Sequence, residues 1–266
     1  MMIRSLSLLA LAGSMAAGAA GASSPRPETI SVWAAYAAAT DSRVERELAA
    51  KARFLAEDFG PNASADAKAI RAGAIVMRRV ESADSVDVPS GMIHHWRGAV
   101  LIPGLRLPDL LASLQRDVPD LGQEDVLRAA VLQRGPGFMK VFLKIRRTKF
   151  VTVVYDTEHL VRFRELGPNR AFSSSTATKI AELRNPGTPA ERELPPGDDR
   201  GFLWRWNAYW RYEATDAGVI VECESLSLSR DVPSMLRYLV GPWIESTARE
   251  SMERTLASMR AHFRKT

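Results

Sequence analysis

The chain has 266 residues, 46% of them hydrophobic and 25% charged, and its formal net charge is +5. This composition and length suit a globular protein with one large domain, or with one domain and an extension. Because the basic residues are dispersed and Cys223 is the only cysteine, neither a nucleic-acid partner nor an intrachain disulfide is expected.

Residues 1–22 have the features of a secretory signal peptide. Arg4 gives a positive start, residues 6–20 are apolar and rich in small residues, and residues 20–22 fit a small-residue cleavage site. The apolar run is short for a membrane anchor. We therefore expect cleavage near Ala22 and a periplasmic or secreted product.

Residues 23–91 form a predicted N-terminal extension with one helix and one strand. The helix is expected over residues 42–59, because Ser42 and Glu45 have capping-box spacing and apolar residues then recur at helical intervals. The strand is expected at residues 74–80. Residues 92–266 are the predicted main domain.

A series of antiparallel strands dominates the main domain. Runs of alternating apolar and polar residues are separated by turn-forming residues, which is the pattern of strands that follow one another along the chain. A short amphipathic helix is expected at residues 107–115, and a Pro-rich loop at residues 185–199. The predicted strands cover residues 92–102, 126–133, 138–146, 150–164 and 171–183, before a final hairpin.

The final hairpin, residues 201–231, carries the strongest pattern in the chain. Alternate residues of a strand point to opposite faces, so one face of the first strand is almost wholly aromatic. Pairing across the turn would continue this apolar face over Val221 and Cys223. The rings on the aromatic face are Phe202, Trp204, Trp206, Trp210 and Tyr212.

A long amphipathic helix is expected at residues 242–264, after a short helical piece and a break at Gly241 and Pro242. An antiparallel sheet with one apolar face needs a cover, which this helix supplies. The predicted fold is α+β, a curved antiparallel sheet wrapped around the C-terminal helix, with an N-terminal helical extension. The apolar stripe of the helix comprises Ile244, Ala248, Met252, Leu256, Met259 and Phe263.

These features resemble the START-like superfamily, also called SRPBCC, which has the helix-grip fold. The resemblance rests on the strand and short helix IHHWRGAVLIPGLRLPDLLASL, the meander of strands, and the hairpin YWRYEATDAGVIVECESLSL that leads into the terminal helix. It implies a cavity for a lipid or another hydrophobe between sheet and helix. A minority of relatives are cyclases or hydrolases. The family has no universal catalytic motif, so no catalytic residue and no cofactor are carried over.

The candidate binding residues are those expected to line this cavity. The alternative is that they form a solid core, because burial of one such ring contributes about 1.5–3 kcal/mol even without a ligand. In the same way, Cys223 is interpreted as a small buried hydrophobe. The predicted lining comprises Trp96, Phe202, Trp204, Trp206, Trp210, Tyr212, Val221, Cys223, Met252 and Leu256.

Polar groups outside this set are interpreted as structural. His94 and His95 are neighbours in a strand and point to opposite faces, and no metal-ligand spacing is present, so no metal is predicted. The serine and threonine run at residues 173–176 lacks a nucleophile-elbow motif and an obvious histidine partner. A charged ladder is interpreted as a solvated outer face rather than a head-group clamp. Its members are Arg205, Asn207, Arg211, Glu222 and Glu224.

The leading hypothesis is an exported protein that binds a hydrophobic small molecule, with a lipid as first candidate. A cyclase- or hydrolase-type enzyme is one alternative, for which Arg205, Glu224 and His95 would have to reach the cavity. An envelope interaction protein that docks through residues 42–90 is another. A basic row also leaves open a transient contact with an anionic membrane, although such rows are more often solvated. The row comprises Lys140, Lys144, Arg146, Arg162 and Arg164.

Overall fold

The computed structural model describes residues 24–83, 85–116, 123, 125–148, 152–231 and 234–264, with the backbone alone described for residues 234–248. The predicted signal peptide, residues 1–22, lies outside the described residues. Within the described ranges, no helix combines the length and the apolar character that crossing a membrane requires.

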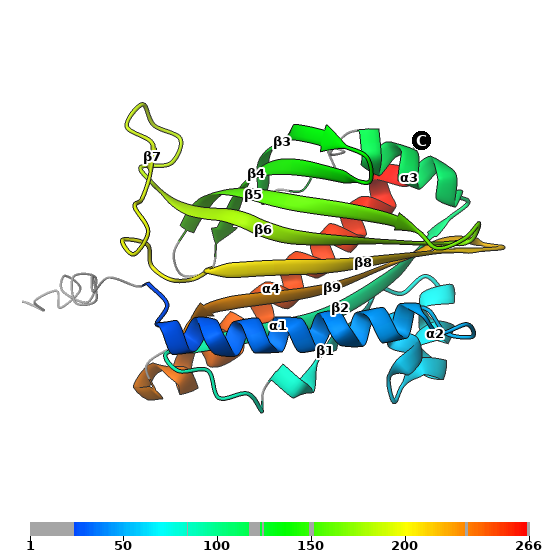
Figure 1. Ribbon diagram of the computed structural model, residues 1–266, viewed down its shortest axis with the longest axis horizontal. Coiled ribbons are helices and arrows are strands. Elements are labelled where there is room, and N and C mark those ends of the chain that lie inside the picture. Colours follow the sequence, from blue (N-terminus) through cyan, green and yellow to red (C-terminus); the bar gives the residue numbers. More distant parts are fainter. Residues whose placement is uncertain are drawn as a thin grey trace, which may run out of the picture.

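One antiparallel sheet organises the fold (Figure 1). The order across it is β1-β2-β9-β8-β6-β5-β4-β3, and β7 pairs with β6 beside this path. Because β9 pairs with β2 along its whole length, the final hairpin lies beside the first long strand. The strands are β1 (Val76–Arg79), β2 (Gly91–Pro103), β3 (Val126–Gly135), β4 (Phe138–Thr148), β5 (Thr152–Glu165), β6 (Arg170–Arg184), β7 (Arg192–Glu193), β8 (Arg205–Thr215) and β9 (Gly218–Arg230).

Two helices cover opposite faces of this sheet. α4 lies obliquely against one face, which we call the inner face, and α1 runs along the other, which we call the outer face (Figure 1). The helical elements of the described residues are α1 (Pro27–Leu48), η1 (Ala56–Phe59), α2 (Ala63–Arg71), η2 (Glu81–Ala83), α3 (Leu107–Arg116) and α4 (Ser234–Phe263).

Both faces of β9 are used. Val221 and Cys223 belong to the apolar cluster under α4, whereas Leu226 and Leu228 belong to the cluster under α1. Side chains on a strand alternate between faces, so a strand covered on both sides is buried at nearly every position. The prediction of a sheet with one covered face is therefore incomplete, because the N-terminal segment covers the second face.

A glycine on β2 determines how close α4 comes to the inner face. A Cβ atom at Gly98 would lie 2.8 Å from Cδ1 of Leu256 and 3.1 Å from Sδ of Met252. Carbon atoms in good contact are about 3.5–4.0 Å apart, so only a residue without a side chain leaves room for these two. The C-terminal half of α4 consequently sits directly on β2.

The N-terminal helix differs from the expectation in its position. α1 begins at Pro27 rather than Ser42 and ends at Leu48, so the capping-box residues lie inside it. Proline at the first helical position is a strong start signal that the periodicity argument overlooked. After α1 the chain turns, because Phe54 is buried in a separate cluster with Ile70. The extension thus contains α1, η1, α2, β1 and η2.

The C-terminal helix is also longer than expected. α4 is continuous over Ser234–Phe263, and no break occurs at Gly241 and Pro242. An internal proline costs about 3 kcal/mol, and we attribute its tolerance to the burial of the apolar stripe against the sheet. In the described part of that stripe, Met252 and Leu256 are buried. The side chains of Ile244 and Ala248 lie outside the described residues.

Candidate ligand-binding face and the buried charge network

The inner face has an apolar half that is filled by side chains. Tyr212, Val221, Cys223, Met252 and Leu256 belong to one buried cluster, which also receives α3. Trp96 and Trp210 are half-buried and contact the same cluster. These seven predicted lining residues therefore lie together, but in this half they form the solid core that the alternative interpretation describes.

Two of the predicted lining residues lie elsewhere. Trp204 packs under α1 with Trp33 and Leu228, and the side chain of Phe202 is 50% exposed. Both precede β8, which begins at Arg205, so strict alternation does not apply to them. The prediction of one continuous aromatic face is wrong at these two positions.

The other half of the inner face is polar. On β9 the inner-facing side chains change to Ser225 and Ser227, which are half-buried, while Leu226 between them has no exposed surface. On β2 the inner-facing His94 is half-buried in the same way. This half of the inner face is thus covered less completely than the outer face behind it.

A group of hydrogen-bonding residues, which we call the polar belt, crosses the inner face from β5 to β9. Its members form separate hydrogen-bonded pairs and small groups rather than one continuous network. Ser173 Oγ lies 3.0 Å from the hydroxyl of Tyr212, and Nε1 of Trp206 donates to Ser225 Oγ at 3.0 Å. The belt comprises Thr157, His159, Ser173, Ser175, Trp206 and Ser225.

His159 is the titratable group of this belt. Its Nε2 lies 3.0 Å from Thr157 Oγ1 and its Nδ1 lies 3.4 Å from Ser175 Oγ. The ring of Trp206 meets it edge to face, with centroids 5.0 Å apart. Burial lowers the pKa of His159 to about 4, so the imidazole is neutral at physiological pH. The serine run at residues 173–176 therefore does have a histidine neighbour, contrary to the sequence-based interpretation.

An open depression of about 440 Å³ lies at one end of the sheet, between α3 and the turn that joins β5 to β6. Leu107 and Leu111 of α3 form one wall, and Glu165 and Pro168 belong to the turn side. Leu166 in that turn is 37% exposed.

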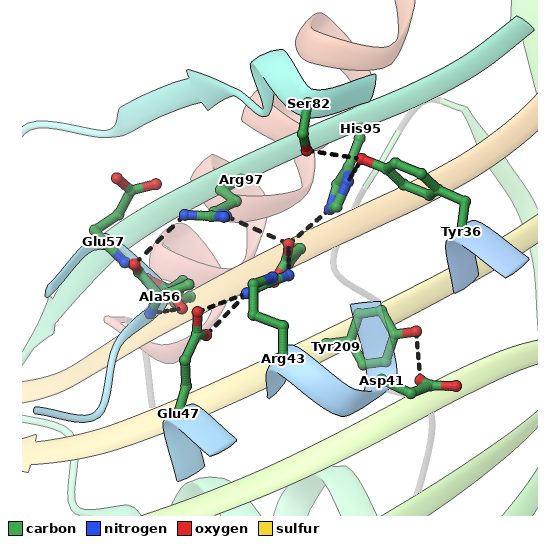
Figure 2. Close-up of polar contacts among 12 residues, drawn as sticks. Tyr36, Asp41, Arg43, Glu47, Ala56, Glu57, Ser82, His95, Arg97 and Tyr209 are labelled. Carbon is green, nitrogen blue, oxygen red and sulfur yellow. Dashed lines mark hydrogen bonds and ion pairs between the residues drawn. The ribbon is translucent and has the colours of Figure 1, made fainter. Parts of the chain in front are cut away.

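The outer face holds a buried charge network beneath α1 (Figure 2). Arg43 of α1 pairs with Glu224 of β9 and donates to Glu47 at 2.8 Å. On β2, His95 Nε2 lies 2.6 Å from Oε1 of the same Glu224, and Tyr36 OH lies 2.8 Å from His95 Nδ1. Figure 2 shows these side chains converging from α1 and the sheet.

A second part of the charge network joins β8 to the segment after α1. Arg211 donates to Glu47 at 2.5 Å and to the carbonyl of Phe54 at 2.8 Å. Glu222 accepts the backbone N–H groups of Ala56 at 2.7 Å and Glu57 at 3.1 Å. These contacts tie the start of η1 to the outer face.

The charged ladder is buried, which corrects the expectation of a solvated face. Arg211, Glu222 and Glu224 are each 1% exposed, because α1 and η1 cover them. Asn207 is half-buried, and only Arg205 is exposed. Alternation in β8 and β9 placed these residues on the correct face, but it cannot show what lies above that face.

The two buried glutamates have pKa values that move in opposite directions. Burial raises the pKa of Glu222 to about 7, and the attraction of Arg211 only partly opposes this. Burial would also raise the pKa of Glu224, but the hydrogen bond from His95 and the charges of Arg97 and Arg43 hold it well below its usual range. Burial lowers the pKa of His95.

The residues proposed for an enzyme do not meet on the inner face. His95 and Glu224 lie on the outer face, and Arg205 donates to the carbonyl of Trp204 at 2.8 Å. His94 points to the opposite side from His95, as predicted, and lies 2.9 Å from Ser229 Oγ. Within the described ranges, no three His, Cys, Asp or Glu side chains are placed to hold a metal ion.

The basic row on β4 and β5 is largely paired with acidic side chains. Lys140 pairs with Glu158 at 2.6 Å, and Lys144 pairs with Glu191 at 2.5 Å. Arg164 pairs with a carboxylate of α1 at 2.9 Å. These pairs reduce the positive charge available to an anionic membrane.

Sequence reasoning missed Arg43 and Glu47, which complete the outer network, and His159, the titratable group of the belt. The proline at the start of α1 could have indicated a helix that contains Arg43 and Glu47. For His159, its place on an alternating strand gave its face but not its neighbours.

No protein-family model matches the chain, and no curated protein matches it. Solved structures do match at low identity. A STAR-related lipid transfer protein from Xanthomonas axonopodis is 18% identical with a TM-score of 0.46, covering 71% of this chain and 98% of that one.

Two further matches have the same character. Human STARD10 is 8% identical with a TM-score of 0.41, covering 75% of this chain and 79% of that one. The Zhui aromatase/cyclase from a Streptomyces species is 10% identical with a TM-score of 0.42, covering 65% and 93%. The described residues themselves form the predicted α+β fold, with an antiparallel sheet, a C-terminal helix across it and additional N-terminal helices.

Proposed function

We propose that this protein binds a hydrophobic small molecule between the inner face of its sheet and α4. The observation that carries the proposal is the unequal cover of that face. The apolar half is closed by the C-terminal half of α4, whereas Trp206, Ser225 and Ser227 in the other half stay half-buried. Half-buried aromatic rings beside a few placed hydroxyl groups are typical of ligand-binding surfaces.

The predicted signal peptide would place this binding in the periplasm or outside the cell. A carrier or store of a hydrophobe fits such a location, because the free molecule would partition into membranes. A lipid is the first candidate for the ligand. The proposal needs no catalytic step, and the hydrogen-bonding groups of the polar belt are uncharged.

Native mass spectrometry of the full chain, purified without detergent, tests the proposal. We expect an adduct that organic solvent releases as a hydrophobic molecule, and saturable binding of N-phenyl-1-naphthylamine by the stripped protein. The bare mass together with no saturable binding of this probe would contradict it.

A pair of variants connects binding to the inner face. Trp206→Ala removes a half-buried ring beside His159, and we expect it to weaken binding of the naphthylamine probe at least about fivefold. Phe202→Ala is the matched control, because this ring is 50% exposed and lies outside the clusters of either face. Equal loss in both variants would mean that the probe binds elsewhere.

A further inference from the structure

The inner face contains a hydrogen-bonding group whose donors and acceptors can be assigned. It consists of Thr157 and His159 on β5 and Ser175 on β6. Thr157 has no exposed surface and His159 is 4% exposed, while Ser175 is half-buried. The three side chains point toward α4, because Ser173 on the same face of β6 contacts Tyr212 of the inner cluster.

Thr157 determines the tautomer of the imidazole. Its hydroxyl donates to the carbonyl of Leu143 at 3.0 Å, so its oxygen is available only as an acceptor toward the ring. Nε2 of His159, 3.0 Å away, therefore carries the proton and donates to it. A neutral imidazole has one N–H, so Nδ1 presents a lone pair to the space beside Ser175.

This lone pair is poorly used within the protein. Ser175 Oγ is 3.4 Å from Nδ1, longer than the common range of about 2.7–3.2 Å for bonds that involve nitrogen. Tyr155, four residues before His159 on the same face of β5, is 2% exposed, and its hydroxyl has no hydrogen-bond partner in the described part of the chain. Buried polar groups are rarely left without partners, so this stretch has unused hydrogen-bonding capacity.

The charges around His159 restrict which kind of ligand could hydrogen-bond to its Nδ1. The inner-facing positions of β5 around the site are Tyr155, Thr157, His159, Val161 and Phe163, and none of them is cationic. The inner-facing cation of the adjacent strand β4, Arg147, is already paired with Asp125 at 2.6 Å. An anionic head group would therefore meet a lone pair and a positive charge that is already neutralised, whereas an uncharged hydroxyl can donate to Nδ1.

We propose that Thr157, His159 and Ser175 form a subsite for the hydroxyl group of an uncharged hydrophobic alcohol or phenol. The ligand hydroxyl donates to Nδ1 of His159, and Ser175 donates to the ligand oxygen. Trp206 packs edge to face against the imidazole of His159 and so fixes its orientation, with ring centroids 5.0 Å apart. This inference rests on the proposed function and specifies its ligand class.

The test compares two probes that differ in one hydrogen-bond donor. Binding of 4-octylphenol and of its methyl ether, 4-octylanisole, is measured by isothermal titration calorimetry on the full chain. We expect the phenol to bind about five- to tenfold more tightly, the value of one good hydrogen bond. His159→Phe keeps a ring beside Trp206 but loses Nδ1, so its phenol-to-ether preference falls to about one through weaker phenol binding alone.

Thr157→Val is the second variant, and it keeps the imidazole of His159 in place. Valine has the shape of threonine but cannot accept from Nε2, so the ring proton moves to Nδ1, where an ether oxygen accepts it as well as a phenol oxygen. We expect the preference to fall toward one because ether binding improves. A structural role alone would weaken both probes together.

The outcomes separate this inference from the proposed function. Equal binding of both probes by the unmodified protein, or a preference that both variants retain, overturns the subsite and leaves hydrophobe binding intact. Failure of both probes to bind the unmodified protein overturns the proposed function, and the subsite with it.

Discussion

The two faces of the sheet are covered by helices of very different chemistry. On the outer face, α1 brings Arg43 and Glu47 onto Glu224 and Arg211, so charges from distant parts of the chain neutralise each other. On the inner face, the described part of α4 covers apolar strand residues with Met252 and Leu256. Its charged contact there is that of Arg254 with Asp125, 3.4 Å apart. The polar belt beyond them is neutral and held by longer contacts.

This difference separates structure from function. Burial of an ion pair is costly unless each charge keeps its partners, so the outer network requires α1 to stay in place. Neutral hydroxyl and imidazole groups carry a smaller penalty and can exchange partners with a ligand. We therefore assign the outer face to stability and the polar half of the inner face to binding.

The largest effect is expected when the outer network loses its buried arginine. Arg211 is 1% exposed and pairs with Glu47 and Glu222. Arg211→Met removes this cation from both carboxylates, and we expect a loss of about 3–5 kcal/mol in the free energy of unfolding. Arg205→Met is the control, because this arginine is exposed on the same strand. Urea denaturation measures both, and a similar small loss in the two variants would show that the network is not structural.

A smaller loss of stability is expected when α4 is pushed away from the inner face. Gly98→Ala places a Cβ atom 2.5 Å from Met77 Sδ of β1 and 2.8 Å from Leu256 Cδ1 of α4, and we expect about 1–3 kcal/mol of destabilisation. Thermal unfolding measures it. An unchanged midpoint would mean that α4 can shift without cost, and that the apolar half of the inner face is not the solid core described above.

The outer network also predicts a pH effect at Glu222, whose pKa is raised to about 7. Between the ordinary glutamate pKa and 7, the folded state keeps a proton that the unfolded state has lost, so raising the pH through this window destabilises the fold. Glu222→Gln removes the effect. Relative to the unmodified protein, its free energy of unfolding should gain about 1 kcal/mol between pH 6 and pH 8.

Comparison with this variant isolates Glu222, because His94, His95 and His159 titrate in both proteins. Burial lowers the pKa of each of these histidines, so each destabilises the fold as the pH falls below 6.5, the ordinary histidine value. Parallel pH profiles for the two proteins would show that Glu222 is ionised in the fold at neutral pH.

The sheet and its C-terminal helix could be predicted from sequence because both follow from local periodicity. The strands at residues 92–102 and 138–146 alternate clearly and lie within the observed β2 and β4. The final hairpin, predicted over residues 201–231, is observed as β8 and β9 from Arg205 to Arg230. The cover of the outer face could not be predicted, since Arg43 and Glu224 are 181 positions apart and alternation only divides residues between faces.

Simple alternation also fails to give the faces of β6 on the two sides of His159. The register of β5 and β6 shifts beside His159, which pairs with Ala177, whereas Glu158 pairs with Lys179. This extra residue in β6 exchanges the faces of the strand on either side of it. His159 and Ser175 lie on the same side of this bulge, in the register that follows from the turn between β5 and β6, whereas beyond the bulge Ile180 pairs with Thr157 and faces inward. The face of Trp204 was also lost to a break in alternation, since β8 begins after it.

Photolabelling tests most directly whether the inner face is the binding face. A long-chain alcohol that carries a diazirine is bound to the full chain, activated by light and located by peptide mass spectrometry. The account predicts labelled peptides from β5, β6 and β8, with labelling suppressed by excess unlabelled alcohol. Labelling confined to α1, or labelling that excess alcohol does not suppress, would contradict it.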